Sequence, residues 1–194
     1  SDSTLRVGKK GENGVLNLKT GKIAYGKGIE SLFSLQWKTE IGKTVFRTNP
    51  MLANGQIVIG SNGRTRNQAD EQDGLYFINP KTGKVQRLLR PETQGKIDVN
   101  GQAIEGDRVY FGNENGHAYY YDFSGKQLWV ADLEGEIENS PALADLTQDG
   151  QLDAVFATDA GKVYALDGKD GSVLWSYQAS GAGYFMASPT CTDL

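Results

Sequence analysis

The loop from Asp145 to Asp153 is the segment of the sequence best suited to bind a metal ion. It reads Asp-Leu-Thr-Gln-Asp-Gly-Gln-Leu-Asp. Calcium takes about six to eight oxygen ligands, and carboxylates at alternate positions of a tight loop can converge on one ion. We therefore predict a calcium site formed by the side chains of Asp145, Thr147, Asp149 and Asp153 and the backbone carbonyl of Gln151. The competing interpretation is a plain Asp-Gly turn with solvated carboxylates.

The composition excludes several other kinds of site. The 194 residues include one cysteine and one histidine, so an intrachain disulfide, a zinc site of four cysteines and a metal cluster of histidines are all excluded. Twenty basic against 24 acidic residues give a net charge of −4, which argues against nucleic acid as a partner. No apolar run approaches the roughly 20 residues of a membrane span. The N-terminus also lacks the apolar stretch of a signal peptide, so if the protein is exported, we expect this sequence to be its mature form.

Three segments share one pattern, and this pattern predicts the elements that position the loop. They are residues 74–85, 116–129 and 161–175, with a weaker copy at 14–22. In each copy, alternating apolar and aromatic residues flank a turn that ends in glycine, which is typical of a β-hairpin. Trp129 and Trp175 lie 46 positions apart, and the first copy has Arg87 at the tryptophan position. This spacing is in the range of propeller blades.

Two further β-rich runs precede each full copy, so each repeat contains four short strands. The inner strands are expected at 49–52, 101–104 and 140–143, and the second strands at 56–60, 108–112 and 153–157. This pattern predicts an all-β protein: a β-propeller of about four four-stranded blades of roughly 46 residues, as part of a larger propeller. We expect a single propeller domain or fragment over 1–194, with blades at 1–47 (incomplete), 48–90, 97–131 and 138–178. An inner strand of a next blade is expected at 187–194.

The two ends of the sequence are out of phase with the blades. Residues 188–194 align with 140–146, so a further inner strand is expected to begin where the sequence stops. One interpretation is a piece of a longer propeller. The other is closure, within one chain or between two chains, in which the last strand completes the first blade. We favour the first interpretation because four blades is the lower limit for propellers.

Residues 161–175 resemble the repeat of pyrroloquinoline-quinone (PQQ)-type propellers, which include quinoprotein alcohol dehydrogenases and the lipoprotein propeller of outer-membrane protein assembly. Residues 140–153 are similar to the FG-GAP repeat of integrin-like propellers. The resemblance covers most of residues 48–194 and implies a propeller fold. FG-GAP-type loops have Asp or Asn where this sequence has Thr147, so the expected calcium site is weak.

The resemblance allows a PQQ enzyme to be weighed against a scaffold. Quinone-binding members often have a vicinal disulfide, which the lone Cys191 excludes, and about half of their blades are missing here. We therefore expect no PQQ and favour a non-catalytic scaffold, periplasmic or extracellular, that binds a protein partner or self-associates. The alternative is an oxidoreductase or sensor propeller that binds a small ligand, such as a quinone or sugar, in its channel.

Three further features are expected to have no catalytic or binding role. The insertion at 61–74 joins strands that the other copies join with shorter loops, and we expect a mobile, solvated excursion. Glu134, Glu136 and Glu138 alternate, so they would lie on one side of an extended segment as a solvated acidic surface. His117 flanks a turn and is expected to be structural.

Overall fold

The computed structural model describes residues 4–7, 14–17, 23–25, 35–181 and 183–192, which belong to two compact units, 1–36 and 37–194. The first unit is an antiparallel sheet in the order β1-β2-β3. Its strands are β1 (Thr4–Val7), β2 (Gly14–Asn17) and β3 (Ile23–Tyr25). No helix in the described residues is long and apolar enough to cross a membrane.

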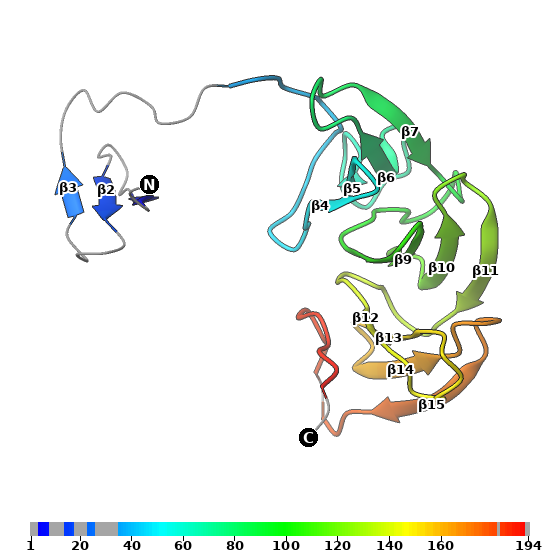
Figure 1. Ribbon diagram of the computed structural model, residues 1–194. Helices are drawn as coiled ribbons and strands as arrows, with labels where there is room; N and C mark the ends of the chain where they lie inside the picture. The colour runs from blue at the N-terminus through cyan, green and yellow to red at the C-terminus, as the bar shows by residue number, and fades with distance from the viewer. Residues whose placement is uncertain (1–3, 8–13, 18–22, 26–34, 182, 193–194) are drawn as a thin grey trace. The chain divides into compact units, whose positions relative to one another are not determined.

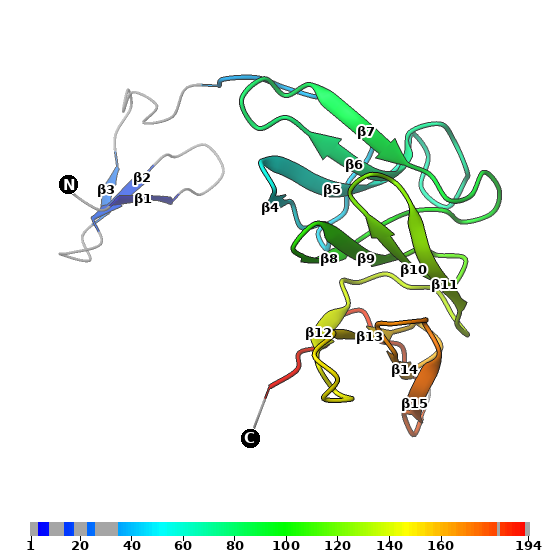
Figure 2. The same cartoon turned by 45° about the vertical axis from the view of Figure 1, so that its right-hand side comes forward.

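The second unit contains three four-stranded sheets, each an antiparallel meander of consecutive strands (Figures 1 and 2). The first sheet contains β4 (Met51–Ala53), β5 (Gln56–Asn62), β6 (Asp73–Ile78) and β7 (Val85–Leu89). The second contains β8 (Gln102–Glu105), β9 (Arg108–Gly112), β10 (His117–Asp122) and β11 (Gln127–Asp132). The third contains β12 (Ala142–Ala144), β13 (Asp153–Ala157), β14 (Lys162–Leu166) and β15 (Val173–Gln178). We call them blades 1, 2 and 3, and they confirm the predicted all-β propeller fold.

The inner strands begin one or two residues later than the sequence pattern predicted. Strands were expected to begin at residues 49 and 140, but β4 and β12 begin at Met51 and Ala142. Pro50 and Pro141 immediately precede them, and proline has no N–H to donate to a ladder. Residues 187–192, expected as part of an inner strand, form no strand. An inner strand pairs with the strand that follows it, and no described strand follows here.

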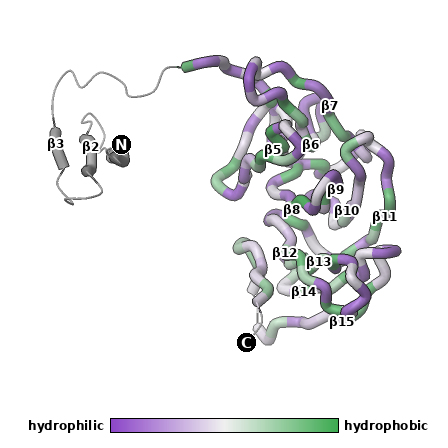
Figure 3. Tube along the Cα trace, viewed as in Figure 1, coloured by the Kyte–Doolittle hydropathy of each residue, from purple (hydrophilic) through white to green (hydrophobic). Residues whose placement is uncertain are grey.

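The core lies between neighbouring blades, so the middle strands are buried on both faces. All of β6 and β13, and the four central residues of β10, are buried. The cluster between blades 1 and 2 includes Phe77, Val99 and Phe111. The cluster between blades 2 and 3 includes Tyr110 and Phe156. Hydrophobic residues accordingly recur along the strands, whereas most turns are hydrophilic (Figure 3).

The contact between blades is close because small residues stand where the next blade crosses. A Cβ atom on Gly112 would lie 2.4 Å from Cγ2 of Ile137, which leads into blade 3. The N–H of Ile137 donates to the carbonyl of Asn113 at 3.1 Å. After blade 3, the N–H of Phe185 donates to the carbonyl of Thr158 at 3.2 Å in the same manner. The chain that leaves blade 3 therefore follows the same route as the chain that passes from blade 2 into blade 3.

A tryptophan repeatedly docks on the hairpin turn of the following blade. Nε1 of Trp37 donates to the carbonyl of Pro80 at 2.8 Å, and Nε1 of Trp129 donates to the carbonyl of Gly168 at 2.9 Å. Arg87 takes this role between blades 1 and 2, where its guanidinium donates to the carbonyl of Ser124. The spacing of about 46 residues thus reflects one docking contact per blade.

Candidate functional site

The predicted calcium loop connects β12 to β13, and its carboxylates bind backbone N–H groups within blade 3. Asp145 accepts hydrogen bonds from the N–H of Asp149 at 3.1 Å and of Gly150 at 3.0 Å. Oδ1 of Asp149 accepts from the N–H of Gln151 at 2.8 Å. Gln148 and Gly150 adopt φ angles of 59° and 87°, which turn the loop sharply. Side chains of the loop itself therefore hold its backbone in this conformation.

Asp153 anchors this loop to the rest of the blade. Its Oδ2 accepts from the N–H groups of Leu146 at 2.8 Å and Thr147 at 3.0 Å, and its Oδ1 accepts from the N–H of Gly168 at 2.9 Å. Asp153 is buried, whereas Asp145 and Asp149 are exposed. Within the described residues, the carboxylates of this loop do not form a group with ligand atoms within 4.8 Å of one another. The calcium site in this loop therefore stays a prediction.

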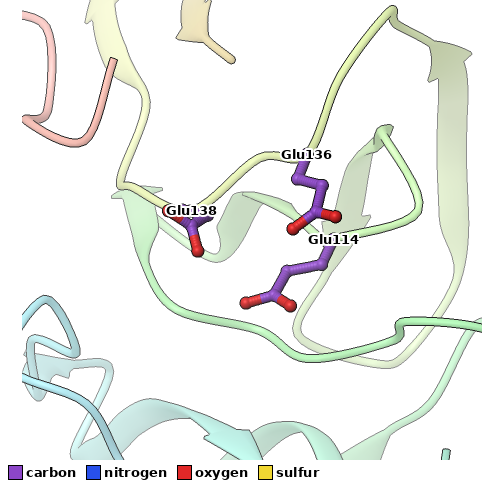
Figure 4. A group of neighbouring side chains, drawn as sticks. All are labelled: Glu114, Glu136 and Glu138. Carbon is purple, nitrogen blue, oxygen red and sulfur yellow. The ribbon is translucent and has the colours of Figure 1, made fainter. Parts of the chain in front are cut away.

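Instead, the structure brings together three glutamates from two different connections. Glu114 lies in the turn between β9 and β10, and Glu136 and Glu138 lie between β11 and β12 (Figure 4). One carboxylate oxygen from each lies within 4.8 Å of those of the other two. We call this group the glutamate cluster. Since Glu114 is remote in the sequence, only the packing of blade 3 against blade 2 assembles it.

The expectation of a solvated surface formed by Glu134, Glu136 and Glu138 was wrong. Glu138 is buried and Glu136 is half-buried, while Glu134 is exposed and its carboxylate pairs with Lys162. The alternation rule requires a regular strand, and residues 133–141 form none. The three side chains therefore do not share one solvent-facing side.

Two arginines from blade 1 reach the glutamate cluster. Nη2 of Arg66 lies 2.8 Å from Oε1 of Glu138 and 3.5 Å from Oε1 of Glu114. Nη2 of Arg47 lies 3.0 Å from the same oxygen of Glu138, and both side chains of this pair are largely buried. These ion pairs connect blade 1 directly to blade 3.

Arg66 belongs to the insertion at 61–74, which is not the free excursion that we expected. The Asp70 carboxylate accepts from the N–H of Arg64 at 2.6 Å and of Gln72 at 2.8 Å. Burial opposes ionisation of Asp70, but these backbone donors outweigh it and lower the pKa of its carboxyl group. The N–H of Asn67 donates to Oδ2 of Asp98 at 3.0 Å. Hydrogen bonds within the insertion, and one to the segment that enters blade 2, thus hold the insertion in place.

A buried chain of polar side chains leads from blade 1 to the cluster. Nδ2 of Asn62 donates to Oδ1 of Asn100 at 2.9 Å, and Nδ2 of Asn100 donates to Oε1 of Glu114 at 2.9 Å. Burial raises the pKa of Glu114, although the Asn100 hydrogen bond and Arg66 lower it. Burial likewise raises the pKa of Asp98 to about 7, against the effect of the Asn67 N–H. Several acidic groups are thus packed where ionisation is disfavoured.

His117 takes part in a second hydrogen-bond network, centred on Glu92. Oε1 of Glu92 lies 2.7 Å from Nδ1 of His117 and accepts from Nδ2 of Asn113 at 2.7 Å and from the hydroxyl of Tyr119. Burial would raise the pKa of Glu92, but the hydrogen bonds outweigh it and lower the pKa. The network holds the connection between blades 1 and 2 against β10, a structural role consistent with the expectation for His117.

Comparison with known proteins identifies the repeat. Residues 76–191 match the PQQ_2 family, described as outer membrane protein assembly factor BamB. Over 111 residues the chain is 30% identical to the outer membrane protein assembly factor BamB of Nitrosomonas eutropha, an alignment that covers 57% of this chain and 25% of that protein. The chain therefore spans about a quarter of the length of this curated relative. The FG-GAP resemblance remains a prediction.

Solved structures support the fold alone, because the sequence identities are low. The computationally designed Ika8 protein aligns with a TM-score of 0.51 and 16% identity, covering 94% of this chain and 50% of the designed chain. The quinohemoprotein alcohol dehydrogenase of Comamonas testosteroni aligns with a TM-score of 0.55 and 17% identity, covering 74% of this chain and 22% of the enzyme.

The family match covers more than half of the sequence, in three blades that share one docking pattern. The chain belongs to the PQQ-repeat propeller family described as outer membrane protein assembly factor BamB.

Proposed function

We propose that this chain is part of a non-catalytic β-propeller that binds other proteins during the assembly of outer-membrane proteins. The observation that carries the proposal is the family match over residues 76–191, together with the relative named as an assembly factor. This function places the protein in the periplasm, at the outer membrane. The likeness to a quinohemoprotein dehydrogenase concerns the fold and gives no support to an oxidoreductase.

The turn at residues 45–48 supports protein binding because it holds a phenylalanine in solvent. Phe46 is 84% exposed. The N–H of Thr48 donates to the carbonyl of Val45 at 3.0 Å, and the N–H of Val45 donates to Oγ1 of Thr48 at 3.1 Å. The Arg47 guanidinium lies 4.8 Å from the Phe46 ring centroid and is anchored by Glu138. A fixed, exposed aromatic ring is the kind of group that anchors protein interfaces.

Leu52 is a second exposed apolar residue, on the first inner strand. It lies in β4 and is 71% exposed, in a strand that pairs on one edge with β5. Large apolar side chains that a folded protein holds exposed can anchor contacts with a partner. We therefore assign partner binding to Phe46 and Leu52.

The experiment deletes the gene for the full-length protein in its source organism and quantifies folded β-barrel proteins in the outer-membrane fraction. We expect their amount to fall and to be restored by the unmutated gene. Phe46→Ser should restore it poorly while leaving the melting temperature unchanged. Val130→Ser, at an exposed apolar residue on the outer strand of blade 2, is the matched control and should restore it fully. Unchanged β-barrel levels after deletion would refute the proposed function.

A further inference from the structure

We propose that the glutamate cluster of Glu114, Glu136 and Glu138 is a second site for a divalent cation, distinct from the loop at 145–153 and specific for calcium over magnesium. This inference does not depend on the proposed function. It assigns a ligand to a place that the sequence pattern did not indicate, where two connections from neighbouring blades meet (Figure 4).

The spacing of the carboxylates fits a calcium ion. Calcium–oxygen distances are about 2.3–2.6 Å, so two oxygens on opposite sides of one ion are about 5 Å apart. One oxygen from each of the three glutamates lies within 4.8 Å of those of the other two. Figure 4 shows the three side chains directed toward a common space. One ion can therefore touch all three without a change of fold.

The second observation is the state of Glu114. Its side chain is 0% exposed, and its Oε2 atom has no hydrogen-bond partner among the described residues. Its other oxygen accepts from Asn100 at 2.9 Å and lies 3.5 Å from Arg66, beyond a good hydrogen bond. A fully buried carboxylate oxygen without a partner is costly, and a bound cation would remove that cost.

Three cationic side chains already pair with the cluster, and two of them can make way for a metal ion. Arg47 and Arg66 both pair with Oε1 of Glu138, while Glu136 pairs with Lys96. The Arg66 and Lys96 side chains are each 45% exposed, so both can withdraw toward solvent. Glu114 is thus the least compensated member. We expect the Arg66 guanidinium to compete with the metal ion for the same oxygens.

Calcium suits this geometry better than magnesium. The ligands come from irregular connections and not from one regular element, and calcium tolerates irregular coordination. Magnesium requires near-octahedral ligands at about 2.0–2.1 Å and gives up its water reluctantly. Since Arg66 competes for the site, we expect a dissociation constant on the order of 10⁻⁴ to 10⁻³ M, as in weak extracellular calcium modules.

The test is isothermal titration of the 194-residue chain with calcium chloride, after removal of metal by chelation, with melting curves in parallel. Glu114→Gln keeps the size of the side chain and should weaken binding at least tenfold. Arg66→Met removes the competing cation and should tighten binding several-fold, although it loses two ion pairs. Glu134→Gln, an exposed glutamate of the same connection, is the matched control and should bind like the unmutated protein. Magnesium should bind more weakly than calcium.

Two results would overturn the site. The first is an absence of calcium binding in both the unmutated chain and Arg66→Met, which would reduce the cluster to an arginine–glutamate network. The second is binding that Glu114→Gln retains and Asp149→Ala abolishes, which would assign the ion to the loop at 145–153. If Glu114→Gln does not fold, as judged by circular dichroism, the half-buried Glu136→Gln replaces it with the same expected loss.

Discussion

The indole of Trp129 lies directly over Gly171, so that a Cβ atom on this glycine would come within 2.9 Å of the ring atoms Cδ2 and Cε3. Trp129 lies in the middle of β11, the outer strand of blade 2, and Gly171 closes the turn between the last two strands of blade 3. Gly83 stands in the same relation to Trp37, with its Cβ position 2.5 Å from Cε3. In each of these turns, the absence of a Cβ atom on the glycine therefore leaves the space in which the tryptophan ring packs.

Gly171→Ala should destabilise the protein more than an alanine at a comparable glycine without such a neighbour. Gly171 has a φ of 78°, so alanine is strained there and also collides with Trp129. We expect a loss of about 1–3 kcal/mol in the free energy of unfolding from the collision in addition to the strain. Gly55→Ala, at a φ of 70° with nothing within 4 Å, measures the strain alone. Equal losses in urea denaturation would contradict the docking role.

Trp129→Phe and Trp175→Phe should have different effects. Trp129 is 5% exposed and donates to the carbonyl of Gly168. Its loss leaves a buried carbonyl unpaired, so we expect about 1–3 kcal/mol of destabilisation. Trp175, at the same position of blade 3, is 46% exposed, and its replacement should change stability by less than about 0.5 kcal/mol. In a longer protein that supplies a further blade, Trp175→Phe should instead resemble Trp129→Phe, and thermal melts of both lengths test this.

Stability should fall as the pH rises through the range in which Asp98 titrates. Burial raises the pKa of Asp98 to about 7, from a value near 4 in the unfolded chain. Below pH 4 the group is protonated in both states. Above this pH the unfolded state loses its proton first, so the stability contributed by protonated Asp98 declines until about pH 7. Asp98→Asn should flatten this decline and stabilise the protein at pH 8, because asparagine can still accept from the N–H of Asn67.

The control for this pH dependence is Glu92, whose pKa is lowered by its hydrogen bonds. A lowered pKa contributes stability above its unfolded value and loses it as the pH falls, which is the opposite direction. Glu92→Gln should therefore change the acid limb of the stability profile and leave the decline between about pH 4 and 7 in place. A profile of Asp98→Asn that follows the unmutated protein throughout would refute the role of Asp98.

Calcium in the loop at 145–153 should raise the melting temperature by a few degrees at millimolar concentration. An ion that binds the folded state alone at a hundredfold excess over its Kd stabilises by about 2.7 kcal/mol. Thr147 replaces one carboxylate ligand, so calcium should bind weakly and the rise in melting temperature should be small. Asp149→Ala should abolish this part of the shift, while the glutamate cluster contributes separately. Identical melts of the unmutated chain in calcium and in chelator would leave an ordinary Asp-Gly turn, held by the contacts of Asp145 and Asp153.

The sequence by itself determined the repeat and therefore the fold. Alternating residues such as those at 162–166, turns that end in Gly125 or Gly171, and tryptophans 46 positions apart are local signals, and each acts through nearby chain geometry. They predicted four strands per blade and the order of the strands. They misplaced strand starts by up to two residues at Pro50 and Pro141, because the ladder decides where pairing begins.

Only the tertiary structure decided which polar residues meet. Glu114, Glu138 and Arg66 are separated by up to 72 positions, and no period relates them. They come together because blades pack face to face and bring their connections to one place. The same packing buries Glu138, which an alternating pattern had placed in solvent, and holds the insertion that carries Arg66. Strand pairing follows from local pattern, whereas the burial and pairing of charges depend on distant segments that no local pattern can specify.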